Sequence, residues 1–97
     1  MIEAGDIHRA DLNDEVRRHV LVVSSARFNA VADRVLVAPE IFGGPDAVPL
    51  PWRVAIDDRV FAVDLLRSLP EERILDRVDR APAPAMAAVR RAVLNII

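Results

Sequence analysis

The chain has 97 residues, 53% of them hydrophobic, which predicts a single domain, residues 1–97, with an apolar core of its own. It contains no cysteine, which excludes disulfides and cysteine-ligated zinc. Its formal net charge of −2 argues against a broadly basic surface of the kind that coats nucleic acids, but leaves room for a local basic groove.

The apolar runs of the chain are short. None approaches the roughly 20 residues that a membrane-spanning helix requires. The first residues, 1–6, also lack a basic segment that leads into an apolar one. We therefore expect a soluble protein that works in the cytoplasm and does not contact a membrane.

Two strands are predicted before residue 25. Residues 7–12 alternate between two faces, as an extended strand requires. A polar, turn-like cluster follows, and then a strand that begins at Val16 or Arg18 and runs to Ser24. Its Val and Leu residues leave no polar face, so the strand must be covered on both sides, as in the wall of a small closed barrel. The two strands suggest an antiparallel hairpin.

The middle of the chain predicts short strands separated by loops. Residues 24–33 suit a loop with one helical turn, and residues 39–52 form an irregular loop with four prolines and two glycines. The polar pair Asp57-Asp58 between β-rich runs indicates a hairpin. The strands expected here are residues 34–38, which Pro39 ends, residues 53–56, and residues 59–63, continued by 64–69.

The last quarter of the chain predicts a turn, a strand and a helix. Residues 70–73 resemble a helical turn capped by Ser68, and residues 74–78 a further strand. A helix is expected from Pro84 to the end of the chain, and its apolar positions at spacings of three and four are Met86, Val89, Val93 and Ile96 or Ile97. The fold class is therefore mainly β with a C-terminal helix, in the form of a small antiparallel barrel of about six strands.

Arg18 is the functional candidate with the clearest physical case. A guanidinium at the mouth of a buried strand stays charged at any working pH and offers several donors to phosphate oxygens. The alternative is a solvated cation in a surface ion pair with Asp14 or Glu15.

Other polar residues have both a functional and a structural interpretation. His19 and His8 titrate near neutrality and would suit acid–base catalysis, but a lone His on a strand is more often structural. Ser24 and Ser25 either donate to a phosphate or cap the following turn. Trp52 either stacks on a nucleobase or packs in the protein.

Neither a metal nor a cofactor is expected. The acidic pairs Asp57-Asp58 and Glu71-Glu72 are adjacent residues that point in different directions, without a spaced His or carboxylate partner. Gly43-Gly44 lacks the elements of a phosphate-binding loop.

With these motifs in place, the chain resembles the MazF/PemK family of toxins from bacterial toxin–antitoxin pairs. Residues 5–12, Gly-Asp-Ile-His-Arg-Ala-Asp-Leu, are similar to the family's opening strand, and residues 18–24, Arg-His-Val-Leu-Val-Val-Ser, to its Arg-Pro-Val-Leu-Val-Val-Ser segment. Residues 59–69 resemble a later segment, with Asp64 and Arg67 at its acidic and basic positions.

The resemblance implies an SH3-like barrel that forms a homodimer, binds a cognate antitoxin and cuts single-stranded RNA without a metal ion. Arg18 matches the family's catalytic Arg. His19 stands where the family has Pro, and Ile41 falls near the position of its catalytic Thr or Ser. The implied chemistry would then use His19 or Glu15 to take a proton and Ser24 to contact the phosphate. We expect further RNA contacts from Arg17, Arg27, Arg67 and Trp52.

The related CcdB toxins provide an alternative function. They share the fold and poison DNA gyrase by binding, without catalysis, through their C-terminal helix. Residues 35–78 resemble them loosely, although this chain ends in Asn95-Ile96-Ile97, where CcdB proteins end in a Trp-Gly-Ile type of sequence. A binding module without toxicity is a third class.

Overall fold

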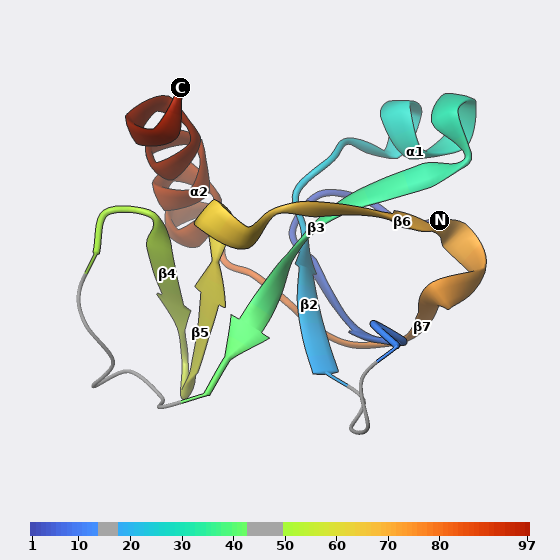
Figure 1. Cartoon of the computed structure of the whole chain (residues 1–97), viewed down its shortest axis with the longest axis horizontal. Coiled ribbons are helices and arrows are strands. Elements are labelled where there is room, and N and C mark those ends of the chain that lie inside the picture. The colour runs from blue at the N-terminus through green and yellow to red at the C-terminus, as the bar shows by residue number, and fades with distance from the viewer. Residues whose placement is uncertain (14–17, 43–49) are drawn as a thin grey trace.

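The computed structural model describes residues 1–13, 18–42 and 50–97, and within them the chain is mainly β with a C-terminal helix (Figure 1). The seven strands are β1 (Asp6–Ala10), β2 (Arg18–Val22), β3 (Arg34–Ile41), β4 (Arg53–Ile56), β5 (Arg59–Ala62), β6 (Arg67–Pro70) and β7 (Ile74–Arg80). The helices are α1 (Ala26–Ala32) and α2 (Ala83–Ile96), with 3-10 turns η2 (Val63–Leu65) and η3 (Glu71–Arg73).

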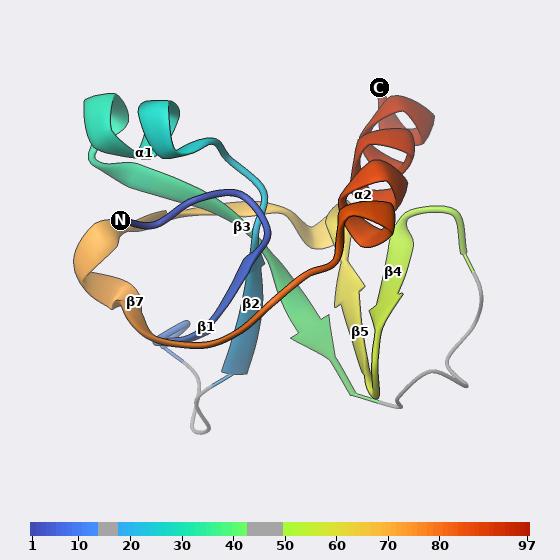
Figure 2. The ribbon, with the colours of Figure 1, turned by 180° about the vertical axis from the view of Figure 1, so that it is seen from behind.

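Five of the strands form a small barrel. The sheet order is β4-β5-β3-β2-β1-β7, with β6 also paired to β3, and every pairing is antiparallel. Because β6 continues through η3 into β7, the path β7-β1-β2-β3-β6 returns to its starting strand (Figure 2). The predicted antiparallel barrel is confirmed, and so is the hairpin of its first two strands.

The apolar run of β2 is covered on both faces, as predicted. Val20 and Val22 point into the barrel, where they pack with Val35, Val37 and Leu69. Leu21, between them, packs with Phe61 and Val89 in a second apolar cluster under α2. The barrel cluster and the α2 cluster therefore share the wall that β2 and its neighbours form.

Helix α2 covers the second apolar cluster, and the structure corrects its predicted inner face at the end of the chain. Ala85, Val89 and Ala92 are buried, while Met86 and Val93 pack against them. Ile96 and Ile97 were expected inside but are 48% and 97% exposed, because the last turn projects beyond β4 and β5 (Figure 1). No helix in residues 1–13, 18–42 and 50–97 is long and apolar enough to cross a membrane.

The structure also corrects the prediction that Pro39 ends the third strand. β3 runs through Pro39 to Ile41. The Leu36 carbonyl accepts a hydrogen bond from Val23 N, 2.9 Å, so alternation along β3 turns the backbone nitrogen of residue 39 away from β2. On that side the pairing with β6 stops at Val37 and the pairing with β5 starts at Glu40. The N–H that proline lacks is therefore not needed by either ladder.

Short-range signals define the other connections, with two further corrections. The hairpin at Asp57-Asp58 is confirmed, since Ile56 pairs with Arg59 and Asp57 takes the left-handed conformation, φ 56°, that aspartate tolerates in turns. The segment expected to extend the fifth strand is interrupted by η2. Ser68 does not cap the turn after it, because its hydroxyl accepts a hydrogen bond from Arg34 Nε, 2.6 Å.

Candidate functional site

The start of β2 and the end of β3 lie at the same edge of the sheet, the lower edge in Figure 1. β2 and β3 are antiparallel, with Val20 opposite Pro39. The same register places Arg18, the first residue of β2, level with Ile41, the last residue of β3. The tertiary structure thus brings together Arg18, the predicted catalytic cation, and Ile41, which falls near the position of the family's catalytic Thr or Ser.

Arg18 contacts an aromatic ring at this edge. Its guanidinium carbon lies 5.0 Å from the centre of the Phe42 ring, within the range of a cation–π interaction. Phe42 follows β3 directly and is 72% exposed. Arg18 itself is only partly buried, so the guanidinium and the ring lie together at the surface of the barrel mouth.

His19 has a carboxylate partner that sequence analysis missed. Its Nδ1 lies 3.2 Å from Glu40 Oε1 on β3, and the two side chains are 30% and 21% exposed. A carboxylate accepts hydrogen bonds, so this contact assigns the ring proton to Nδ1 and leaves Nε2 available.

The His19 and Glu40 pair belongs to a polar row that crosses four strands. Arg9 on β1 is the cross-strand neighbour of His19, and its Nε donates to Asp76 Oδ1 on β7, 2.8 Å. The Arg9 hydrogen bond, together with one from the backbone of Asp76, lowers the pKa of Asp76. The row therefore has an acidic group at each end, Asp76 on β7 and Glu40 on β3, with Arg9 and His19 between them, next to the edge that carries Arg18.

Strand alternation places Arg18 and His19 on opposite faces of β2. Arg18 is paired with Ala10, which belongs to the barrel cluster, and shares its face with Val20. His19 shares its face with Leu21, which packs in the α2 cluster. The structure therefore joins Arg18 to Phe42 and His19 to Glu40, and it turns Arg18 and His19, which the sequence placed in one site, to opposite faces of the strand.

Ser24 has a structural position. The residue is 8% exposed, and its hydroxyl donates to Asn29 Oδ1 and accepts from Leu36 N, 2.9 Å. Its one proton is thus already donated inside the protein, to the helix that follows. Ser24 does not cap the following helix either, because the N-cap of α1 is Ser25, whose hydroxyl accepts from Phe28 N, 3.1 Å.

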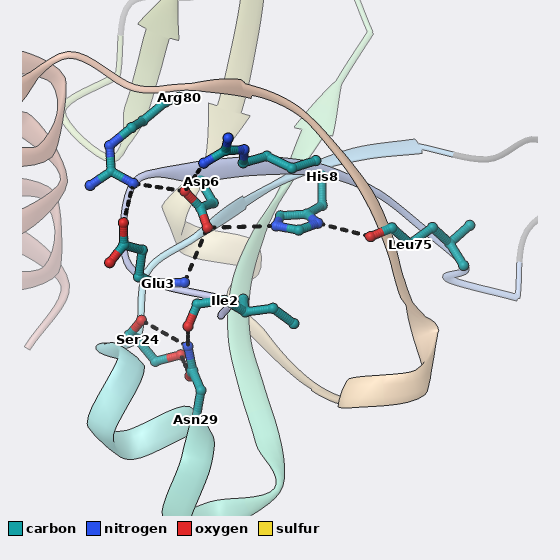
Figure 3. A network of polar contacts seen from close by, with 9 residues as sticks. Ile2, Glu3, Asp6, His8, Ser24, Asn29, Leu75 and Arg80 are labelled. Carbon is teal, nitrogen blue, oxygen red and sulfur yellow. Dashed lines mark hydrogen bonds and ion pairs between the residues drawn. The ribbon is translucent and has the colours of Figure 1, made fainter.

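His8 also lies in a structural network, which Figure 3 shows. It is 7% exposed, and its Nδ1 donates to the Leu75 carbonyl, 2.9 Å. Its Nε2 lies 3.7 Å from the carboxylate of Asp6, which is 1% exposed. Arg80 donates to Asp6 Oδ1, 2.8 Å, and to Glu3 Oε1, 2.6 Å. These contacts tie the start of β1 to β7.

Three residues expected to contact RNA lie away from Arg18. Trp52 is half-buried against the α2 cluster, as its packing interpretation predicts. Arg67 pairs with Val37, which is opposite Val22, so it lies about 13 Å along the strands from Arg18. Arg27 is exposed on α1, at the upper edge in Figure 1.

Several predicted residues cannot be placed. Glu15 and Arg17 lie outside the described residues, and so does Asp14, the other proposed ion-pair partner of Arg18. Among the residues that the structure does describe, no group of three or more acidic or His side chains is arranged to hold a metal ion. Glu40 and Phe42 were missed because no local pattern marks them, and only the strand register reveals their partners.

Comparison with known proteins places the chain among bacterial toxins. The family described as PemK-like, MazF-like toxin of type II toxin–antitoxin system matches residues 3–97. No protein of curated function matches the chain in sequence.

Solved structures of MazF toxins share the fold. A mycobacterial endoribonuclease in complex with its cognate antitoxin superposes with a TM-score of 0.86 at 17% identity, covering 98% of this chain and 93% of that chain. MazE-MazF of Deinococcus radiodurans in Form-II has a TM-score of 0.82 at 26% identity, with coverage of 98% and 93%. Its Form-I has a TM-score of 0.75 at 29% identity, with coverage of 99% and 97%. These likenesses lend no support to the gyrase-poison alternative.

Proposed function

Because the chain belongs to the family of PemK-like, MazF-like toxins of type II toxin–antitoxin systems, we propose that it is an endoribonuclease that cuts single-stranded RNA without a metal ion. The observation that carries the proposal is the position of Arg18, which is partly exposed at the edge where β2 begins and β3 ends. A guanidinium held there by a buried strand is placed to bind a phosphate.

The reaction is an attack of the RNA 2′-hydroxyl on the neighbouring phosphate. The 2′-oxygen forms a bond to phosphorus and loses its proton to a base, while the bond to the 5′-oxygen breaks and that oxygen takes up a proton. The products carry a 2′,3′-cyclic phosphate and a 5′-hydroxyl. Arg18 stabilises the negative charge that develops on the phosphate oxygens in the transition state.

The proton acceptor is His19 or Glu15. Two observations support His19 in this role. Its side chain is partly exposed, and the contact of Nδ1 with Glu40 leaves Nε2 as the atom that accepts the proton. Since His19 shares its face of β2 with Leu21, opposite Arg18, RNA would have to pass over the edge of the strand to meet both side chains. Ser24 is left out of the proposed chemistry, because its hydroxyl is committed to Asn29 and Leu36.

Beyond the scissile phosphate we propose contacts with the RNA backbone by Arg67, Arg17 and Arg27. Arg67 is exposed and lies at a distance from Arg18 that a few nucleotides of extended RNA would span. Trp52 is not part of this proposal, because its side chain packs against the α2 cluster.

We also propose that the protein works in the cytoplasm as a homodimer that a cognate antitoxin inhibits. The mycobacterial endoribonuclease with the same fold was solved with its cognate antitoxin, and MazF of Deinococcus radiodurans with MazE. RNA targets and antitoxins of such pairs meet in the cytoplasm.

The test is incubation of the purified protein with a long single-stranded RNA in EDTA, followed by analysis of fragment lengths and end groups. We expect fragments with cyclic phosphate ends, and a loss of at least about 100-fold in cleavage rate for Arg18→Ala, because one charged donor to the transition state is removed. Arg91→Ala, which removes an exposed Arg from α2, is the matched control for net charge.

Two results would contradict the proposal. Intact RNA with the parent protein would exclude ribonuclease activity on this substrate. Cleavage by Arg18→Ala at the parent rate, with an unchanged circular dichroism spectrum, would remove Arg18 from the reaction.

A further inference from the structure

Phe42 is a large apolar side chain left 72% exposed at the edge that carries Arg18. It differs from Phe61, which is fully buried, and from Phe28, which is 42% exposed on α1. Its ring lies 5.0 Å from the guanidinium carbon of Arg18. The apolar face of the ring is therefore open to a ligand beside the cation proposed to bind phosphate.

We propose that Phe42 is the stacking platform for a nucleobase next to the phosphate that Arg18 holds. The inference rests on the proposed ribonuclease function and names a specific base contact within it. Every nucleobase has a π-face, and a base that stacks on an aromatic side chain contributes roughly 1–3 kcal/mol to binding of single strands. The partner is therefore one unpaired base of single-stranded RNA.

The geometry favours this residue over Trp52, the aromatic side chain that the sequence suggested for stacking. Trp52 is held against the α2 cluster, and its backbone carbonyl accepts from Val63 N, 2.9 Å. Phe42 is exposed, and it contacts the guanidinium proposed to act on phosphate. A nucleotide bound at Arg18 thus has its base within reach of Phe42, because base and phosphate of one nucleotide are joined only through the sugar.

A competing explanation is that Phe42 serves only to orient the Arg18 guanidinium through the cation–π contact. The two roles differ in what happens once Arg18 is removed. An orienting ring has no function without the guanidinium, whereas a stacking ring still binds a base. The distinction can be measured by binding alone, with no cleavage.

The experiment measures the affinity of single-stranded 2′-fluoro RNA of randomised sequence, which lacks the attacking hydroxyl. The proteins are the parent, Phe42→Ala, Phe42→Trp, Arg18→Ala and the double variant of Arg18→Ala with Phe42→Ala. We expect Phe42→Ala to weaken binding by about 5-fold to 150-fold, both in the parent and in the Arg18→Ala background. Phe42→Trp keeps a stacking surface and should bind like the parent. Phe28→Ala, which removes an exposed ring from α1, is the matched control and should also bind like the parent.

Four outcomes overturn the inference. Parent-like binding by Phe42→Ala excludes stacking, and this result leaves the ribonuclease function intact if Arg18→Ala still abolishes cleavage. No effect of Phe42→Ala in the Arg18→Ala background assigns the ring to orienting Arg18. An equal loss in Phe28→Ala shows that the effect is not specific to this edge. If the parent neither binds nor cuts RNA, the proposed function itself fails and the inference fails with it.

Discussion

The hydroxyl of Ser24 has a structural role, because its hydrogen bonds are all made within the fold and none is left for a substrate phosphate. It donates to Asn29 and accepts from Leu36 N, and the Asn29 amide in turn donates to the Ile2 carbonyl, 2.9 Å (Figure 3). The side chain therefore joins α1, β3 and the start of the chain. A buried hydroxyl of this kind stabilises the fold, because removing it leaves the partners without a hydrogen bond.

Ser24→Ala is accordingly predicted to lower stability and to spare activity. We expect a loss of about 1–3 kcal/mol in the free energy of unfolding, from the unsatisfied Leu36 N–H and Asn29 Oδ1, measured by urea titration. Cleavage of RNA well below the melting temperature should be unchanged. Ser68→Ala, at an exposed hydroxyl, is the control and should cost about 0.5 kcal/mol or less. Unchanged stability with lost cleavage would instead make Ser24 catalytic.

At the scale of one element, α2 shows which part of an amphipathic pattern is used. Its central turns press Ala85, Val89 and Ala92 onto β4 and η2, and its last turn is exposed. Apolar residues at spacings of three and four predict that they share one face of the helix. They do not predict how far the neighbouring sheet extends along that face. The sheet beneath ends before the helix does, so Ile96 and Ile97 have no apolar surface to pack against and are exposed.

Val89→Asp is predicted to unfold the protein or come close to it. Val89 is 2% exposed, so the substitution places an unpaired carboxylate in an apolar cluster and should cost more than about 3 kcal/mol. Thermal unfolding followed by circular dichroism is the measurement. Ile97→Asp introduces the same carboxylate at the C-cap of the same helix, at a residue that is 97% exposed, and should cost no more than about 1 kcal/mol. A melting temperature for Val89→Asp near that of the parent would mean that α2 presents another face to the sheet.

At the scale of the whole molecule, two apolar clusters share one set of strands. Residues of β2 and β3 alternate between the barrel cluster and the α2 cluster, as Val37 and Ala38 do. Loosening one cluster therefore shifts the backbone that supports the other. The domain should unfold as a single cooperative unit.

Leu69→Ala tests this coupling. Leu69 is 2% exposed in the barrel cluster, and its truncation should cost about 2–5 kcal/mol. Fluorescence of Trp52, which lies against the other cluster, and circular dichroism should report the same lowered transition at a fixed protein concentration. Two separate transitions, with Trp52 fluorescence unaffected by the substitution, would show that the clusters unfold independently.

The sequence alone determined the features that depend on near neighbours along the chain. The run of apolar residues in β2 required cover on both faces, the polar pair Asp57-Asp58 required a turn, and the ordered motifs carried the resemblance to the toxin family that residues 3–97 match. Hydrophobic period and turn chemistry are local properties, so they can be predicted without a tertiary structure.

Only the tertiary structure decided what depends on strand register. Whether Pro39 ends a strand depends on which neighbour its missing N–H would face, and the partners of His19 and Arg18 come from β3 and from the residue that follows it. A shift of one residue in that pairing would turn each of these side chains to the other face. The register is set by packing across the whole barrel, and for that reason Glu40 and Phe42 entered the candidate site only when the strands were in place.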